Sequence, residues 1–388
     1  MIYLDNAATS YPKPQNVTDR IVTMMSDVVG TPGRGNHVSA AKATFGVSSV
    51  RRDFMEFFNL LEDYRIVFTY SATDALNMAI KGFIKQGDHV VMTHTEHNSV
   101  SRPLNAMERD GFISLDIAPC SQEGYVLVDE FRKLVTDKTK LVVVCHGSNV
   151  TGAVQDIETL GQIVREKGSY LLLDAAQTAG VINIDMRKMP IDFLAAAGHK
   201  GLYGMQGTGI LVLGERIFKL DPFREGGTGF DSYSECQPIN WPEAFESGTH
   251  NVPGIISMGE GLKFIQETGI ENIAKVELEH TQKLWDFLSS FDNIRLYGPN
   301  PENNKMRCGV ISFNVDGWES EDIGVVLNQN YDIHTRAGLQ CAPLAHKFLD
   351  TFPVGTVRIS PGYFTTENDI DNFCNAMKRI AIMDVPLY

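Results

Sequence analysis

The chain has 388 residues, of which 43% are hydrophobic and 21% are charged, and its formal net charge is −14 at pH 7. This composition excludes a generally disordered protein, and no run reaches the roughly 18 apolar residues of a membrane span. Lysines and arginines are dispersed, which argues against a nucleic-acid or membrane surface. The N-terminus lacks a secretory signal pattern, so we expect a cytoplasmic protein.

The region from residue 16 to residue 255 is predicted to form a large domain of the α/β class. Short β-rich runs alternate there with helical patterns, and continuous apolar strands favour a mostly parallel sheet covered on both faces. Ligands of such sheets bind at the carboxyl ends of the strands. The seven predicted strands contain residues 66–69, 89–92, 112–115, 141–144, 170–173, 193–195 and 210–213.

A possible phosphate site follows the first predicted strand. There Ser71, Ala72 and Thr73 precede an apolar-periodic helix, Leu76–Phe83. Small residues let backbone N–H groups approach a phosphate, and a helix N-terminus favours the anion. The alternative is an ordinary capping segment, with Asp74 stabilising the first turn.

Polar side chains follow the next strands. His97 could place its flat ring over a cofactor ring, although His94, His97 and His146 could instead bind a metal. Their spacing is not that of a zinc protease and they have no thiolate partner, which argues against the metal. Asn149 and Gln177 offer hydrogen-bond donors to a ligand, or belong to ordinary turns and caps.

Asp174 and Lys200 carry the most specific chemistry in the sequence. Asp174 ends the apolar run at 170–173, and Lys200 follows another apolar run in a Gly-His-Lys turn. An aldehyde cofactor such as pyridoxal phosphate needs a lysine for a Schiff base and a carboxylate to keep its pyridine nitrogen protonated. The pair therefore predicts this cofactor.

The remainder of the chain is predicted to form a smaller α+β domain, residues 256–388, with residues 1–15 as an arm packed against it. The pattern becomes irregular between about 221 and 254, and such long stretches are usually functional or interfacial. Beyond 256 the sequence predicts strands near 293–296, 308–313 and 357–360 and a final amphipathic helix, Glu367–Ile382.

Cys341 is the candidate nucleophile among six widely spaced cysteines. It lies in a loop-like segment with Gly ahead and Pro behind, where Arg336 could help to lower its pKa. The other five cysteines are expected to be buried and inert. Arg358, at the end of a strand, could bind a substrate carboxylate through two hydrogen bonds, or form a surface salt bridge.

These motifs resemble class V (fold type I) pyridoxal phosphate enzymes, and most closely the family of cysteine desulfurases and selenocysteine lyases. The resemblance covers the whole chain, and its short Arg-x-Gly-x-x-Cys loop is similar to that of the Suf-type branch. The motifs that carry it are Tyr3–Thr9, Ser71–Thr73, Glu96–His97, Ser148–Gly152, Asp174–Gln177, Gly198–Lys200, Glu246–Thr249, Arg336–Ala342 and Arg358.

The resemblance implies that Lys200 holds pyridoxal 5'-phosphate, that Asp174 pairs with its ring nitrogen and that His97 stacks on its ring. Gln177 and Asn149 would contact the phenolic oxygen or the substrate side of the ring. The family also implies a homodimer with shared active sites. The phosphate would be held by the N–H of Ala72, by Thr73 and His199, and by Thr249 reaching across from the neighbouring subunit.

The same resemblance implies the reaction. Arg358 would bind the carboxylate of L-cysteine, with Arg336 nearby, and Cys341 would take the sulfur as a persulfide and leave L-alanine. A sulfur-acceptor protein would then receive the sulfur, and L-selenocysteine is a possible second substrate.

Four residues depart from the family pattern. Ala197 stands where many relatives have a phosphate-binding Ser or Thr, and Gln340 stands where relatives often have His before the cysteine. Met205 and His250 each replace a commoner Pro. Ala197 puts one phosphate contact in doubt and Gln340 puts one proton donor in doubt.

Two other functions stay open on the sequence. Another class V reaction, such as transamination or kynureninase-like cleavage, would not need Cys341. A catalytically silent sulfur carrier or scaffold would not need Lys200, Asp174 and Cys341 together. Function has to be argued from the site rather than from the fold, and these three residues favour the desulfurase.

Overall fold

The computed structural model describes residues 1–61, 65–229, 233–303 and 306–382. Within them a seven-stranded sheet has the order β2-β8-β7-β6-β5-β3-β4. β8 is antiparallel to β2 and β7, and the other pairs are parallel. The strands are β2 (Arg65–Thr69), β3 (His89–Thr93), β4 (Ser114–Ala118), β5 (Thr139–Cys145), β6 (Tyr170–Asp174), β7 (Phe193–Ala197) and β8 (Gly209–Leu213). The mostly parallel α/β sheet is confirmed, although the run at 112–115 forms its strand about two residues later than predicted.

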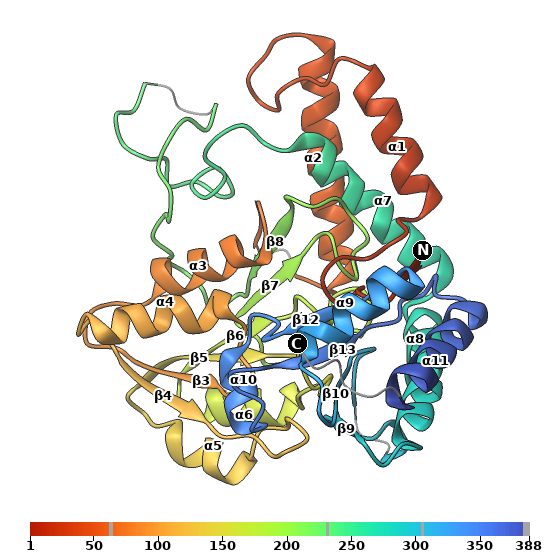
Figure 1. Ribbon diagram of the computed structural model, residues 1–388. Coiled ribbons are helices and arrows are strands. Elements are labelled where there is room, and N and C mark those ends of the chain that lie inside the picture. The colour runs from red at the N-terminus through yellow and green to blue at the C-terminus, as the bar shows by residue number, and fades with distance from the viewer. Residues whose placement is uncertain (62–64, 230–232, 304–305, 383–388) are drawn as a thin grey trace.

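Both faces of this sheet contribute to a hydrophobic core. Successive residues of a strand point to opposite sides, so alternate residues join different cores. In β5, Val142 and Val144 join one core while Leu141 and Val143 join the other. α3 (Ala72–Phe83) and α4 (Asn98–Arg109) cover the second face, side by side in Figure 1. The first face is covered by α2 (Val38–Phe57), α5 (Val128–Leu134), α6 (Ile157–Glu166) and α7 (Val252–Thr268).

A smaller antiparallel sheet, in the order β12-β13-β10-β9, follows along the chain. Its strands are β9 (Ile294–Tyr297), β10 (Ile311–Val315), β12 (Arg336–Gly338) and β13 (Thr356–Ile359). α8 (Ile270–Ser289), α9 (Ser320–Tyr331) and α11 (Glu367–Ile382) pack their apolar residues on this sheet. The final helix has the predicted bounds, whereas β12 was not predicted.

The first residues of the chain lie against this smaller sheet region. β1 (Ile2–Tyr3) pairs in parallel with β11 (Ile333–His334), and Leu4 is buried in the same core as α8 and α11. The predicted boundary at 255/256 falls inside the unbroken helix α7, which packs with α1 (Gln15–Ser26) and α2 in Figure 1. The division into an arm and two domains stays a prediction.

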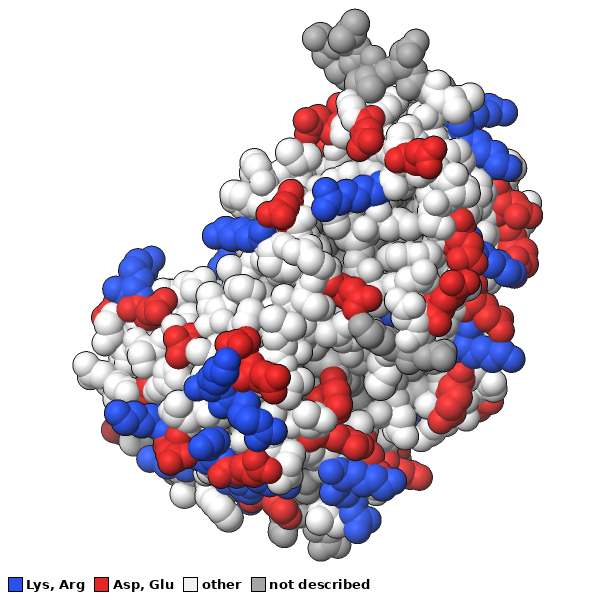
Figure 2. Space-filling model, turned by 90° about the horizontal axis from the view of Figure 1, so that it is seen from below, with Lys and Arg blue, Asp and Glu red and all other residues white. Residues whose placement is uncertain are grey.

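Two features of the described residues bear on partners. Acidic and basic side chains are interspersed over the face shown in Figure 2. None of the helices in the described ranges combines the length and apolar character needed to cross a bilayer.

Candidate active site

A cavity of about 210 Å³ lies at the carboxyl ends of β3, β5, β6 and β7, next to the N-terminus of α3. The carboxyl ends of parallel strands meet at one edge of a sheet, so residues distant in sequence converge there. Eight of the predicted site residues line this one cavity, and these are Ala72, Thr73, His97, Asn149, Asp174, Gln177, His199 and Lys200.

Asp174 and Lys200 form the charged centre of the cavity. Asp174 is the last residue of β6, only 3% exposed, and its Oδ1 accepts a hydrogen bond from the Ala176 N–H at 3.0 Å. Burial raises the pKa of Asp174, while the Ala176 N–H and the charge of Lys200 lower it. Burial, and next the charge of Arg358, lower the pKa of Lys200 to about 8. At pH 7 roughly a tenth of the Lys200 amine is therefore neutral, far more than for an ordinary lysine.

His97 presents a neutral ring to the cavity. It is the N-cap of α4, and its Nδ1 accepts a hydrogen bond from the Ser99 N–H at 3.1 Å. A backbone N–H can only donate, so the ring proton resides on Nε2. Burial, followed by the charge of Lys200, lowers the pKa of His97 to about 4, which keeps the ring uncharged at neutral pH.

The helix N-terminus at the other end of the cavity is capped and keeps its first residues facing the cavity. Ser71 Oγ accepts from the Asp74 N–H at 3.1 Å, and the Asp74 carboxylate pairs with Arg224 at 3.1 Å. The capping interpretation therefore holds for Ser71 and Asp74, while Ala72 and Thr73 line the cavity. An α-helix N-terminus carries unpaired N–H groups and partial positive charge, both of which favour an anion.

The N-terminal segment holds the Lys200 turn from behind, a feature that the sequence did not reveal. Ser10 Oγ donates to the Lys200 carbonyl at 2.9 Å, and Lys13 Nζ donates to the His199 carbonyl at 2.7 Å. Gln177 Nε2 donates to the Ala7 carbonyl at 3.0 Å. Thus one amide proton of Gln177 is used by the protein itself.

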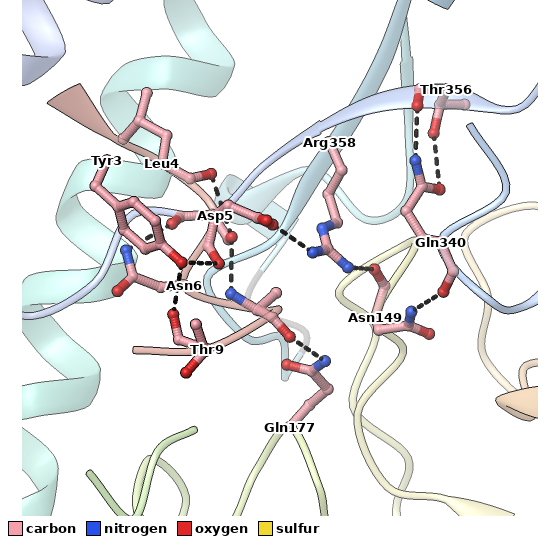
Figure 3. A network of polar contacts seen from close by, with 12 residues as sticks. Tyr3, Leu4, Asp5, Asn6, Thr9, Asn149, Gln177, Gln340, Thr356 and Arg358 are labelled. Carbon is pink, nitrogen blue, oxygen red and sulfur yellow. Dashed lines mark hydrogen bonds and ion pairs between the residues drawn. The ribbon is translucent and has the colours of Figure 1, made fainter. Parts of the chain in front are cut away.

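Arg358 is buried and is bonded both to Asn149, which lines the cavity, and to Asp5 in the N-terminal segment. Only 3% exposed, it donates from Nη2 to Asp5 Oδ1 at 2.6 Å and from Nη1 to the Asn149 carbonyl at 3.2 Å (Figure 3). The predicted surface alternative is wrong, because the ion pair is buried. The sequence motif Tyr3–Thr9 contains Asp5 but does not indicate that Asp5 pairs with Arg358.

The loop of Cys341 adjoins the cavity through backbone contacts. Cys341 is exposed, its carbonyl accepts from the Asn98 N–H at 2.7 Å, and the Gln340 carbonyl accepts from Asn149 Nδ2 at 2.6 Å. Arg336 is exposed in β12, directly opposite Arg358 in the antiparallel register, so both side chains lie on one face of the smaller sheet.

Comparison with known proteins agrees with this architecture. The family model for aminotransferase class-V matches residues 2–373. The chain belongs to the class-V aminotransferase family. A "probable cysteine desulfurase" of Synechocystis sp. is 32% identical over 97% of this chain and 90% of that protein, and one of Methanothermobacter thermautotrophicus is 32% identical over 98% and 95%. The apo structure of a cysteine desulfurase from Thermococcus onnurineus NA1 superposes with a TM-score of 0.91 at 30% identity, covering 98% of this chain and 94% of that one.

Of the other predicted residues of this class-V chain, Ala197 lines the cavity, whereas Thr249 is not among the lining residues. Thr249 is exposed, and its carbonyl accepts from the Tyr70 hydroxyl at 3.3 Å. Ala197 lines the cavity without a hydroxyl, whereas Met205 bonds Ser257 and His250 lies 3.6 Å from Glu246. The role of Thr249 in a neighbouring subunit and the branch within the family stay predictions.

The other cysteines and the histidines proposed as metal ligands differ in their surroundings. Cys236 is exposed, and Cys120 and Cys374 are half-buried, so the prediction that all five other cysteines are buried is wrong. His146 Nδ1 pairs with Thr178 Oγ1 at 2.8 Å, and His94 stacks on Phe348. Among the described residues there is no group of three or more His, Cys, Asp or Glu placed to hold a metal ion.

Proposed function

We propose that this chain is a pyridoxal phosphate-dependent cysteine desulfurase that converts L-cysteine to L-alanine and takes the sulfur on Cys341. One observation carries the proposal: an exposed cysteine is tied, through Gln340 and Asn149, to a cavity that contains a lysine of lowered pKa beside a buried carboxyl. The relatives named cysteine desulfurase support it.

The lining residues fit the cofactor on grounds of the structure alone. Two buried polar atoms of the cavity residues, Asn149 Oδ1 and His199 Nδ1, have no hydrogen-bond partner among the described residues, as expected where a polar ligand supplies it. Lys200 would hold the aldehyde, Asp174 the ring nitrogen, and the N-terminus of α3 with His199 the phosphate. When bound, this cofactor serves as an electron sink for bond breaking at the substrate.

The protein groups prepare that chemistry by their charge states. A cationic ring nitrogen beside Asp174 would favour the ionised form of Asp174. This opposes burial, which raises the pKa of that carboxyl. His97, neutral at physiological pH, can lie on a ring without adding charge. Arg358, held by Asp5 and the Asn149 carbonyl, would present its guanidinium to the carboxylate of the substrate.

The sulfur step balances without an external oxidant. The bond between the β-carbon and sulfur of L-cysteine breaks, a bond forms between that sulfur and Cys341 Sγ, and the β-carbon takes a proton. The substrate carbon is thereby reduced and the cysteine sulfur oxidised to the persulfide level. An exposed Cys341 is accessible for the next transfer, to a sulfur-acceptor protein.

Two further features belong to this proposal. We infer a homodimer in which Thr249 reaches the phosphate of the neighbouring subunit. Measurement of the molecular mass in solution tests whether the protein is a dimer. We also infer a cytoplasmic protein that accepts L-selenocysteine as a second substrate.

Replacing the nucleophile tests the proposed function. Cys341→Ala should bind cofactor and L-cysteine normally but release almost no alanine from L-cysteine, because no protein thiolate takes the sulfur. Turnover of L-selenocysteine should fall less, since selenium leaves more readily. The measurement is alanine released per cofactor-bound subunit, with Cys236→Ala as the matched exposed-cysteine control. Wild-type cysteine turnover in Cys341→Ala would refute the mechanism and favour another class V reaction.

A further inference from the structure

The residue before the nucleophile turns its side chain inward. Gln340 is 4% exposed, and its Nε2 donates to the Thr356 carbonyl at 2.6 Å. A carbonyl can only accept, so the amide nitrogen faces Thr356 and Oε1 faces His346 Nε2, 2.8 Å away. Figure 3 shows the contacts of Gln340 with Thr356 and Asn149. The side chain of Gln340 therefore joins Thr356 and His346, while its backbone carbonyl accepts from Asn149.

His346 is fixed in a single form by its surroundings. It lies in α10 (Pro343–Phe348), is fully buried, and burial lowers its pKa to about 4. Because Oε1 of Gln340 accepts, the neutral ring carries its proton on Nε2. Nδ1 then accepts from the Thr351 hydroxyl at 2.7 Å. The anchor of Gln340 is thus itself held in place.

The backbone at this point is in an unfavourable conformation. Gln340 and Cys341 both have positive φ, +40° and +58°, and neither is glycine. Side chains rarely adopt the left-handed region, so two such residues in succession persist only when surrounding contacts hold them. Those contacts are the side-chain bonds of Gln340 and the bonds that Asn149 and Asn98 donate to the two carbonyls.

We propose that Gln340 is a positioning residue for Cys341. Its side chain anchors the left-handed turn to α10 and β13, and its carbonyl places that turn on Asn149. Asn149 in turn accepts from Arg358, so one network sets the thiol relative to the proposed carboxylate-binding guanidinium. This inference rests on the proposed desulfurase function and assigns a role to a residue that departs from the family pattern.

A buried glutamine elsewhere in the chain offers a matched control. Gln155 is 2% exposed, its Oε1 accepts from the Val126 N–H and its Nε2 donates to the Gly124 carbonyl, both at 2.9 Å. It makes similar bonds but contacts neither the Cys341 loop nor the cavity lining described above. Gln155→Met therefore measures the loss of a buried amide without loss of thiol positioning.

The experiment compares alanine release from L-cysteine and from L-selenocysteine. Gln340→Met should lower kcat with L-cysteine by between about tenfold and a hundredfold, the effect of misplacing a reacting group, with little change in KM. Turnover of L-selenocysteine should fall much less, in the same direction as in Cys341→Ala. In the Cys341→Ala background, Gln340→Met should add no further loss with either substrate. Gln155→Met should keep both kcat values per folded subunit.

Two more variants separate the possible causes. Gln340→Gly removes the backbone cost but also the anchor, so wild-type kcat in this variant would overturn the role of the side chain. Gln340→Glu keeps an acceptor for His346 and tests the proposal if the methionine variant does not fold. We expect it to lower kcat with L-cysteine less than Gln340→Gly does, and an equal or larger loss would overturn the role of the bond to His346.

The outcomes distinguish the two proposals. If wild-type protein releases no alanine from L-cysteine, the proposed function fails regardless of Gln340. If wild type is active and Gln340→Met keeps its kcat, or loses cysteine and selenocysteine turnover equally, the positioning role is overturned.

Discussion

The cavity lining and the Cys341 loop are held in place by different kinds of interaction. Asp174 ends one strand of the buried, mostly parallel sheet, and His97 and Lys200 follow two others. The hydrogen-bond register of β3, β6 and β7 therefore sets where their backbones lie. Cys341 follows a three-residue strand and lies in a left-handed turn held by side-chain hydrogen bonds. The first arrangement comes from topology and the second from individual contacts.

This difference predicts how each region responds to substitution. A change at a strand end removes a chemical group but leaves the backbone that presents it, because the sheet is buried on both faces. A change in the network around Asp5, Asn149, Gln340 and Arg358 removes a support, so stability and geometry should change together. Substitutions in the two regions should therefore give different combinations of lost activity and lost stability.

Lys200→Ala should give the largest loss, at least about a thousandfold in alanine release, because it removes the proposed covalent attachment. The fold should persist, with unchanged circular dichroism. Borohydride reduction of the wild-type protein with pyridoxal phosphate should label the peptide that contains Lys200.

Lys13→Ala is the matched control for this prediction. Burial lowers the pKa of Lys13 to about 8, as for Lys200, and its amine lies near the same turn. The label should stay on Lys200 in that variant. A label found on Lys13 in the wild-type protein, and lost in Lys13→Ala, would show that attachment follows the lowered pKa rather than the predicted position.

Asp5→Asn should instead destabilise the protein, by roughly 3 kcal/mol, because it leaves the buried guanidinium of Arg358 without its ionised partner. Urea unfolding followed by fluorescence measures the loss, and KM for L-cysteine should rise as Arg358 loses its orientation. Asp221→Asn, which breaks an exposed pair with Lys85, is the control and should cost below about 1 kcal/mol. Equal losses in the two variants would contradict the idea that the Arg358 network is a support.

The same contrast explains what the sequence could predict. The sheet and the positions of Asp174, Lys200, His97 and Asn149 follow from apolar runs that end in polar residues, a local pattern. The roles of Asp5, Ser10 and Lys13 do not, because their partners are distant: Asp5 and Arg358 are 353 residues apart. Such a contact is set by tertiary folding, and no periodicity in residues 1–15 indicates it.

The turn at Gln340 and Cys341 was equally invisible in the sequence. Positive φ is usually signalled by glycine or asparagine, and the two residues here are glutamine and cysteine. Three-residue β12 is also too short to show a strand pattern. Gln340 was noted only as a departure, and its three side-chain contacts came from the structure.

The pH dependence of cofactor attachment gives the smallest expected effect and probes the link between the two regions. Only a neutral amine attacks an aldehyde, so the attachment rate should rise with pH and level off above the pKa of Lys200. Burial and the charge of Arg358 lower that pKa from an ordinary 10.5 to about 8. At pH 7 the rate should therefore be about tenfold below its plateau, against roughly three-thousandfold for an ordinary lysine. Absorbance changes after mixing apo-protein with pyridoxal phosphate between pH 6 and about 10 measure the attachment rate.

Two arginine variants test the contribution of Arg358 to this pH dependence. Arg358→Met should move the midpoint to higher pH, since a repelling charge is removed. Arg336→Met alters an exposed residue and should leave the midpoint in place. A wild-type rate that keeps rising towards the ordinary pKa would show that neither burial nor Arg358 acts on the amine, and the network that holds Arg358 would then have no electrostatic effect on the cavity.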